Sequence, residues 1–469
     1  MKQQFRIYIY FTLIFALAFC LVRYVQFPFD PASWRLKSFE EVVVVDVDST
    51  AKLSELDVDS EVVQPVPIEK DTVITKEFLS CPSQFLKQLN RLNAALQQTS
   101  TSNKNIRILH YGDSQIEGDR ITAYLREAFQ KRYGGSGPGL ITVFDPQRIN
   151  PSVWLDNKGE WKISTVYNRK HRIADKSYGL MGQTASLDGS SYGIFKISAS
   201  HWAEEHASHY QKVRLFIAPH TDSLNIKGTI KDTEVINDVL PPSSALTEIN
   251  WEFEQLSPTI KFELNSLGRV HILGCALDSI NGVSVDNIAL RGQSSPLLHR
   301  TNGDLYKAMS EHMDIGMVIF QFGANIIPTV APNYHFYKVQ LSKQFKFLQE
   351  YLPNVPVVVV GISDAAHINE GQLSSYQHLS RIRDAQKAIA LEFKFAFFDL
   401  YQAMGGEGSI IKWTEKNPPW ALTDYLHFSR RGGKEVAAYL SKALWQHIEQ
   451  PQSSDTCLFT ESHKPCLIY

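Results

Sequence analysis

A short stretch in the first third of the chain, residues 106–118 (IRILHYGDSQIEG), most constrains what the chain can fold into. It begins with apolar residues in a strand pattern, breaks at the tripeptide 112–114 (GDS), and continues from Ile116 with apolar residues at helical spacing. This pattern predicts a strand, a tight turn and a helix. The turn would place the Ser114 hydroxyl at the carboxyl edge of a sheet, where open α/β sheets bind ligands, with free N–H groups of the helix start nearby.

A lone Gly-Asp-Ser turn most often only caps a helix, so a chemical role for Ser114 depends on distant partners. A second buried-strand pattern, 317–320, leads directly to Asn325. Near the C-terminus, Asp424 and His427 lie three residues apart, before a glycine pair and an amphipathic helix. A serine hydroxyl is a weak nucleophile that needs a base such as imidazole, and a carboxylate can fix the tautomer of that imidazole. The chain therefore supplies a nucleophile, a base, an acid and an amide donor.

These segments, together with the glycine of Leu-Arg-Gly at Gly292, resemble in order and context the four sequence blocks of the SGNH (GDSL-type) hydrolases. The resemblance implies that Ser114 is the nucleophile, that His427 is the general base and then acid, and that Asp424 orients it. It also implies an oxyanion hole formed by the backbone N–H groups of Ser114 and Gly292 with the side-chain amide of Asn325.

Two neighbours of the serine need separate comment. Asp113 is expected to support the turn rather than to take part in the chemistry. Gln115 stands where the family's name implies leucine, which makes a lipid substrate less favoured. The longer segments 110–122, 405–413 and 424–429 resemble the membrane-anchored bacterial branch that acts on O-acetylated cell-wall or exported polysaccharides, as peptidoglycan O-acetylesterases do.

Alternating strand and helix patterns, together with the resemblance, predict an α/β fold: a three-layer α/β/α sandwich with a parallel sheet. Between residues 150 and 283 the pattern changes to short alternating segments separated by turns. This change predicts an inserted all-β domain of jelly-roll type, which the resemblance suggests is a carbohydrate-binding module. The hydrolase domain is then expected in two parts, 76–149 and 284–450, followed by a tail over 451–469.

The N-terminus has the pattern of a targeting segment. Lys2 and Arg6 precede a nearly continuous apolar run, which predicts a signal anchor over 1–26. Positive charge before the run predicts that this end stays in the cytoplasm and the rest lies across the membrane. With the resemblance to the bacterial branch, this implies an inner-membrane protein whose catalytic part faces the periplasm. The alternative is a cleaved signal peptide and a secreted or periplasmic protein. Residues 27–75, rich in Asp, Glu and Val, are expected to form a stalk.

Composition and motifs argue against several classes of ligand. The net charge of -2, without a basic stripe interleaved with aromatics, argues against a nucleic-acid partner. The glycine-rich segment 133–140 lacks the Lys-Ser/Thr ending of a phosphate-binding loop, and no Cys/His cluster has zinc-ligand spacing, so neither cofactor nor metal is expected. Of the five cysteines, Cys457 and Cys466 could pair in an oxidising compartment, with free thiols equally expected.

Several aromatic and histidine residues have two interpretations. Tryptophans of the predicted insert could stack on sugar rings, although packing in the core is favoured. They are Trp154, Trp161, Trp202 and Trp251. Trp413 and Trp420, in the loop before the Asp–His pair, are candidate pocket walls or packing residues. Surface or core positions are expected for His110, His367 and His378.

The sequence therefore predicts a serine esterase that removes O-acetyl groups from a cell-wall or exported polysaccharide through an acyl-serine. Two alternatives stay open. The same site could pass the acetyl group to another sugar, which would make the chain an O-acetyltransferase with an unidentified partner in an acyl-transfer pathway. The chain could also be a glycan-binding scaffold with an inactive hydrolase domain.

Overall fold

The structure is a computed structural model, and the residues that it describes fall into five ranges. They are 73–145, 150–230, 233–257, 259–369 and 371–448. The predicted anchor (1–26), the tail (451–469) and both of its cysteines, Cys457 and Cys466, lie outside these ranges. Among the described helices, none combines the length and the apolar character that a membrane crossing needs.

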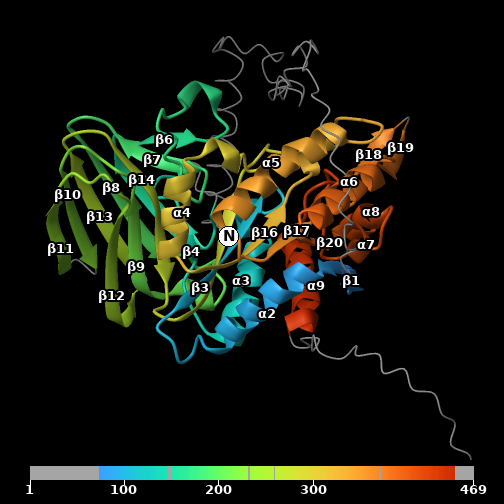
Figure 1. The fold of residues 1–469 in the computed structure, drawn as a ribbon, viewed down its shortest axis with the longest axis horizontal. Coiled ribbons are helices and arrows are strands. Elements are labelled where there is room, and N and C mark those ends of the chain that lie inside the picture. The colour runs from blue at the N-terminus through green and yellow to red at the C-terminus, as the bar shows by residue number, and fades with distance from the viewer. Residues whose placement is uncertain (1–72, 146–149, 231–232, 258, 370, 449–469) are drawn as a thin grey trace, which may run out of the picture. The chain divides into compact units, whose positions relative to one another are not determined.

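A seven-stranded sheet forms the centre of the hydrolase part, in the order β1-β2-β20-β17-β16-β3-β15 (Figure 1). Its strands are β1 (Val73–Lys76), β2 (Leu79–Pro82), β3 (Asn105–Gly112), β15 (Gly282–Ala289), β16 (Ile315–Gln321), β17 (Val357–Val360) and β20 (Ala396–Phe398). From β15 to β20 neighbouring strands pair in parallel, and β2 and β1 extend the sheet antiparallel at one edge. Every residue of β3 is buried, as expected for an inner strand of a sheet covered on both faces.

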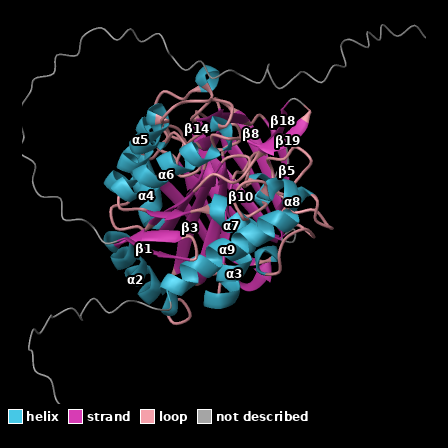
Figure 2. Cartoon of the chain, turned by 90° about the vertical axis from the view of Figure 1, so that its right-hand side faces the viewer, coloured by secondary structure: helices cyan, strands magenta, loops and turns pink. Residues whose placement is uncertain are grey.

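Helices cover both faces of this sheet, so the hydrolase part has three layers (Figures 1 and 2). The six larger ones are α2 (Ser83–Gln97), α3 (Thr122–Tyr133), α4 (Gly303–His312), α5 (His335–Tyr351), α6 (Leu379–Glu392) and α9 (Arg430–Ile448). Alternate residues of β3 serve the two layers: Leu109 and Tyr111 share a core with α4, α5 and α6, whereas Ile106 and Ile108 share one with α2, α3 and α9. The predicted α/β fold is confirmed.

The segment between α3 and β15 forms two antiparallel sheets that enclose a core of their own. One sheet has the order β11-β10-β13-β8-β5 and the other β12-β9-β14-β7-β6, with β4 paired to β14. The strands are β4 (Gly139–Ile141), β5 (Val153–Gly159), β6 (Lys162–Thr165), β7 (Gln183–Leu187), β8 (Ser191–Ala199), β9 (Tyr210–Ile217), β10 (Leu224–Ile230), β11 (Thr233–Leu240), β12 (Thr247–Ser257), β13 (Thr259–Ser266) and β14 (Val270–Asp278). This arrangement is consistent with the predicted all-β insert.

Three boundaries differ from those expected. β1 pairs with β2 from Val73 onward, so residues 73–75 belong to the sheet and not to the stalk predicted over 27–75. The strand that returns to the hydrolase sheet begins at Gly282, two residues before the predicted boundary. β4 lies inside the range assigned to the hydrolase domain, yet it pairs with β14 of the insert. Each of these strands is short or is paired far along the chain, and local periodicity does not reveal such pairing.

A buried ionic network joins the insert to the hydrolase sheet. Arg107 on β3 pairs with Asp286 on β15 at 2.5 Å and also with Asp278 at the end of β14. Arg214 on β9 reaches the same Asp278 carboxylate at 3.2 Å. Burial raises the pKa of Asp278, but the two guanidinium groups outweigh it and hold that pKa below its ordinary value. Because an unpaired charge at such a site is costly, the network fixes how the insert meets β3.

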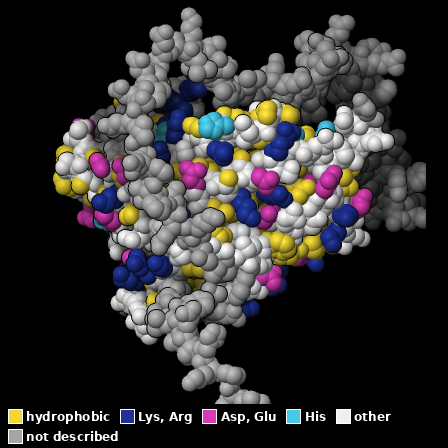
Figure 3. Space-filling model, turned by 45° about the vertical axis from the view of Figure 1, so that its right-hand side comes forward, with side chains coloured by type: hydrophobic (Ala, Val, Ile, Leu, Met, Phe, Trp, Pro, Cys, Tyr) yellow, Lys and Arg dark blue, Asp and Glu magenta, His cyan; other side chains and the backbone are white. Residues whose placement is uncertain are grey.

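The surface of the described part carries charges of both signs. On the face shown in Figure 3, Lys and Arg side chains are interspersed with Asp and Glu side chains and with apolar ones. This mixture agrees with the formal net charge of -2 for the whole sequence.

Candidate active site

Ser114 lies two residues after Gly112, the last residue of β3, where a side chain has little room. A Cβ on Gly112 would lie 2.8 Å from the side chain of Ile116 and 3.0 Å from the carbonyl oxygen of Gln321. β3 therefore ends close against β16, and the chain turns sharply there. The predicted strand and turn are found where the sequence placed them.

The predicted helix start is wrong. After the turn the chain forms a single 3-10 turn, η3 (Glu117–Asp119), in which Gly118 has a φ of +68°, and α3 begins only at Thr122. Asp119 is buried and pairs with Arg126 at 2.6 Å. The N–H groups near Ser114 consequently belong to a turn and not to the first turn of α3.

The structure brings the three residues expected to carry the chemistry into one hydrogen-bonded row. The Ser114 hydroxyl lies 2.8 Å from Nε2 of His427, and Nδ1 of His427 lies 2.7 Å from Oδ2 of Asp424. Partial burial raises the pKa of Asp424, but hydrogen bonds from the ring and the backbone N–H of His427 lower it to about 2. Because Asp424 is a carboxylate at neutral pH, the proton of the neutral imidazole belongs on Nδ1. Nε2 can then accept the serine proton.

Gln115 connects the serine turn to the loop that carries His427. Its side-chain amide donates to the carbonyl oxygen of Leu426 at 2.8 Å, and the residue is only 4% exposed. The residue that departs from the family's name therefore ties the serine turn to the loop that carries His427, a contact that the sequence did not indicate. The signal that could have revealed it is a polar side chain at a position where the family places an apolar one.

Replacing Gln115 with leucine should lower kcat for an acetyl ester by about tenfold, because one hydrogen bond that positions the base is lost. The melting temperature should stay close to that of the wild type, since leucine suits a buried position. Gln349→Leu is the matched control, because it removes an amide that donates to the Phe393 carbonyl oxygen at 3.0 Å on the far helices. Equal kcat values for wild type and Gln115→Leu would contradict the positioning role.

Asp113 is buried beneath the turn and joins two loops. It accepts hydrogen bonds from the backbone N–H groups of Gln115 at 3.0 Å and of Gly323 and Ala324, each at 3.2 Å. Burial raises the pKa of Asp113 to about 6, against the opposing effect of these three donors. Asp113 therefore holds the serine turn, as expected from the sequence, and it also holds the loop that precedes Asn325.

The loop containing Gly292 lies between the serine turn and the Asn325 loop, because it contacts both. Arg291 pairs with Glu117 at 3.6 Å, and the Asn325 side-chain amide donates to the carbonyl oxygen of Gln293 at 2.9 Å. Gly292 has a φ of +75°, and no atom lies within 4 Å of where its Cβ would be. Within the described ranges, no acceptor occupies the backbone N–H of Ser114 or of Gly292. The three expected oxyanion donors thus come from adjoining loops.

The other three histidines named from the sequence make hydrogen bonds or ring contacts within the fold. His110 is buried with Nε2 3.0 Å from Oε1 of Gln321 and Nδ1 2.9 Å from the Thr122 hydroxyl, and burial lowers its pKa to about 4. His378 is buried against the Ile327 carbonyl oxygen, and His367 stacks on a tyrosine ring.

The pKa of His110 is lower in the folded state than in the unfolded chain. His110 therefore takes up a proton when the protein unfolds between about pH 6.5 and 4. Its contribution to the free energy of unfolding is therefore intact above pH 6.5 and lost, by about 3 kcal/mol, as the pH falls to 4. Asp113, with its pKa raised from 3.8 to about 6, acts with the opposite sign over a similar range. Urea unfolding of wild type and His110→Gln at pH 7 and pH 4 separates the contribution of His110 from that of Asp113. The variant should lose less stability on acidification, and equal losses would exclude His110 as the source.

The tryptophans divide between core and surface. Trp161 is buried, and Trp251 packs on Phe262 with ring centroids 5.1 Å apart, whereas Trp154 and Trp202 are exposed. Trp413 is buried and packs on Trp420, with ring centroids 5.3 Å apart. It is therefore a packing residue and does not form a pocket wall.

The described residues contain one group of three side chains that could share a metal ion: Glu127, Glu205 and His206. None of them belongs to the Ser–His–Asp row. The chemistry that the row supports is nucleophilic acyl transfer, in which a serine, an imidazole and oxyanion donors carry each step.

Comparison with known proteins gives similarity in structure only. No family model matches the sequence, and no curated protein matches it. A solved structure of a peptidoglycan O-acetylesterase is similar, with a TM-score of 0.59 and 19% sequence identity, over 78% of this chain and 97% of that one. A GDSL-like lipase from Parabacteroides merdae matches with a TM-score of 0.27 and 16% identity, over 35% of this chain and 73% of its own. A family two carbohydrate esterase from Clostridium thermocellum matches with a TM-score of 0.24 and 9% identity, over 62% of this chain and 99% of its own. The chain therefore shares the fold of the peptidoglycan O-acetylesterase, which agrees with the fold expected from the resemblance to the SGNH hydrolases.

Proposed function

We propose that this chain is a serine esterase that removes O-acetyl groups from a cell-wall or exported polysaccharide. The observation that carries the proposal is the hydrogen-bonded row from Ser114 to His427 to Asp424, at 2.8 Å and 2.7 Å. The similarity to a peptidoglycan O-acetylesterase supports the choice of substrate class, because it extends over 97% of that chain and therefore beyond the hydrolase sheet alone.

In the proposed reaction the Ser114 oxygen attacks the acetyl carbonyl carbon while Nε2 of His427 takes the serine proton. The carbonyl oxygen becomes an oxyanion, which the N–H groups of Ser114 and Gly292 and the Asn325 amide stabilise. His427 then returns the proton to the sugar oxygen, the ester bond breaks, and the acetyl group stays on Ser114. A water molecule attacks this acyl-serine, His427 accepts its proton and returns it to Ser114, and acetate leaves.

Exposure of the site favours hydrolysis over transfer to a second sugar. The side chains of Asp424 and His427 are 47% and 23% exposed, so water reaches the base from the surface. Acetyl transfer is favoured where water is excluded from the intermediate, which this open arrangement does not provide.

A fluorophosphonate probe tests the nucleophile directly, because it forms a stable covalent bond only with an activated serine. The expected result is a single adduct on the wild-type protein, mapped by mass spectrometry to the peptide containing Ser114. Ser114→Ala should give no adduct, and Asp424→Asn should react much more slowly. Labelling of both wild type and Ser114→Ala at another residue would contradict the assignment.

We also propose that residues 1–26 anchor the protein in the bacterial inner membrane with the hydrolase part in the periplasm, where cell-wall glycan lies. Lys2 and Arg6, followed by the apolar run, support this orientation. Protease added to spheroplasts should digest the hydrolase part, and the protein should stay with the membrane after carbonate extraction. Release by carbonate would instead support the cleaved signal peptide.

A further inference from the structure

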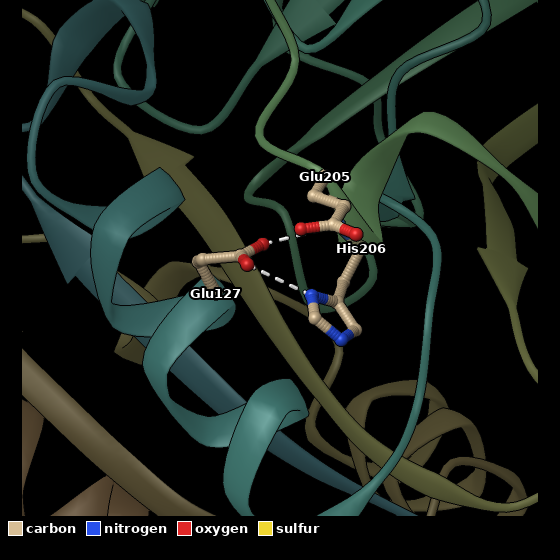
Figure 4. A group of neighbouring side chains, drawn as sticks. All are labelled: Glu127, Glu205 and His206. Carbon is tan, nitrogen blue, oxygen red and sulfur yellow. Dashed lines mark hydrogen bonds and ion pairs between the residues drawn. The ribbon is translucent and has the colours of Figure 1, made fainter.

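Residues 200–206 follow β8 in the insert and lead toward β9. This segment contacts the hydrolase part near each of its two ends. At one end, the Arg430 guanidinium donates to the carbonyl oxygen of Trp202 at 3.3 Å. At the other end, the ring Nδ1 and the backbone N–H of His206 donate to the carboxylate of Glu127 at 2.8 Å and 3.1 Å. Figure 4 shows Glu127, on α3, facing His206 of η5 (His206–Ser208).

Both anchoring points belong to segments that carry the proposed chemistry. Arg430 begins α9 and lies three residues after His427. Glu127 lies on α3, and Arg120 just before that helix donates to the Ser114 carbonyl oxygen at 3.1 Å. The start of α9 packs tightly on this same segment, since a Cβ on Gly433 would lie 2.1 Å from the carbonyl oxygen of Arg120. Residues 200–206 are therefore joined to α3 and to the start of α9, the two helices that follow the serine turn and the loop carrying the base.

Within this anchored loop, the indole ring of Trp202 is left uncovered. The residue is 62% exposed, more than any other large aromatic residue in the described ranges, and its ring lies near His201 with centroids 4.8 Å apart. Its backbone carbonyl accepts the hydrogen bond from Arg430, so the backbone at this residue needs little further ordering on binding. A flat indole face packs well against the apolar C–H face of a pyranose ring, while the sugar hydroxyls stay in water.

We propose that Trp202 is a substrate-binding residue of this site, which stacks on a sugar ring of the glycan next to the acetylated one. The inference rests on the proposed function and adds to it a contact made by the insert. It explains why the insert reaches α3 and α9 through fixed contacts while an apolar ring in the same loop is exposed. The Glu127–Glu205–His206 group then acts as a clamp for the loop, since His206 already occupies both carboxylate oxygens of Glu127.

The first test is direct binding in a Ser114→Ala background, which removes turnover from the measurement. Calorimetric titration of the full-length protein with soluble O-acetylated peptidoglycan fragments should show affinity about tenfold weaker for Trp202→Ala, and little change for Trp202→Phe, which keeps a flat ring. Tyr192→Ala is the matched control, because Tyr192 is a 47% exposed aromatic residue near the opposite end of β8. Its affinity should stay within about twofold of the parent.

The second test separates binding from chemistry in proteins that keep Ser114. Trp202→Ala should raise KM for the O-acetylated polymer about tenfold and leave kcat/KM for 4-nitrophenyl acetate within about twofold of wild type. Equal losses on both substrates would show that the loop only supports the fold and would overturn the proposal. Binding that is unchanged by Trp202→Ala, or lost equally in Tyr192→Ala, would also overturn it.

The two tests also distinguish failure of this inference from failure of the esterase proposal. If wild type released no acetate from either ester, the esterase proposal would fail. Loss of glycan binding in Trp202→Ala would then still support the contact. If wild type were active and the Ser114→Ala parent bound glycan equally well with and without Trp202, only the inference about Trp202 would fail.

Discussion

Replacing His427 with alanine should lower kcat for an acetyl ester by about 10⁵-fold, because the Ser114 hydroxyl then has no base within hydrogen-bond reach. The structure leaves no substitute in the row, since Asp424 contacts the imidazole and not the serine. KM should change little, because the imidazole acts on the proton and not on the bound sugar. The measurement is steady-state hydrolysis of 4-nitrophenyl acetate and of an O-acetylated glycan.

His335→Ala is the control for the His427 variant. His335 is exposed at the start of α5, and its backbone N–H bonds to Asn333. Both variants should keep the melting temperature of the wild type. A His427 variant that keeps more than about one hundredth of the wild-type kcat would be incompatible with general-base catalysis by this residue.

Replacing Asn325 with alanine should lower kcat by about 10²- to 10³-fold, since removal of one oxyanion donor typically costs about 3–4 kcal/mol of transition-state stabilisation. The effect should fall on kcat and not on KM, because the donor is needed where charge develops. The Asn325 amide also donates to the Gln293 carbonyl oxygen at 2.9 Å, so part of the loss would come from a displaced Gly292 loop.

Two further variants resolve the contribution of that loop. Asn333→Ala removes an asparagine whose side chain accepts the local bond from the His335 N–H, and it should leave kcat unchanged. Arg291→Ala removes the 3.6 Å pair between the Gly292 loop and Glu117, and it should cost far less than Asn325→Ala. If the two losses were equal, Asn325 would act only by holding the loop.

Local sequence was enough to find the parts of the site that follow buried strands. The apolar pattern before Gly112 and that before Gln321 identify β3 and β16, and both end at the same edge because neighbouring strands are parallel. The Asp424–His427 spacing was equally readable, since a turn that brings both side chains together needs only the four residues themselves.

Local sequence could not give the contacts between distant segments. The start of α3 was misplaced because Gly118 and Asp119 adopt positive φ values, and Asp119 turns inward to Arg126. The hydrogen bond from Gln115 to Leu426 and that from Arg430 to Trp202 join residues 311 and 228 positions apart. No periodicity encodes such pairs, so the parts of the site that depend on them emerge only in the fold.

The most direct test of the central claim is acetate release from O-acetylated peptidoglycan by purified full-length wild type and Ser114→Ala protein, with 4-nitrophenyl acetate as a second substrate. We predict release from both substrates by wild type, a kcat/KM higher for the glycan, and loss of at least about 10⁴-fold in the variant. Release that is equal in wild type and Ser114→Ala, or absent in both, would contradict a serine esterase at this site.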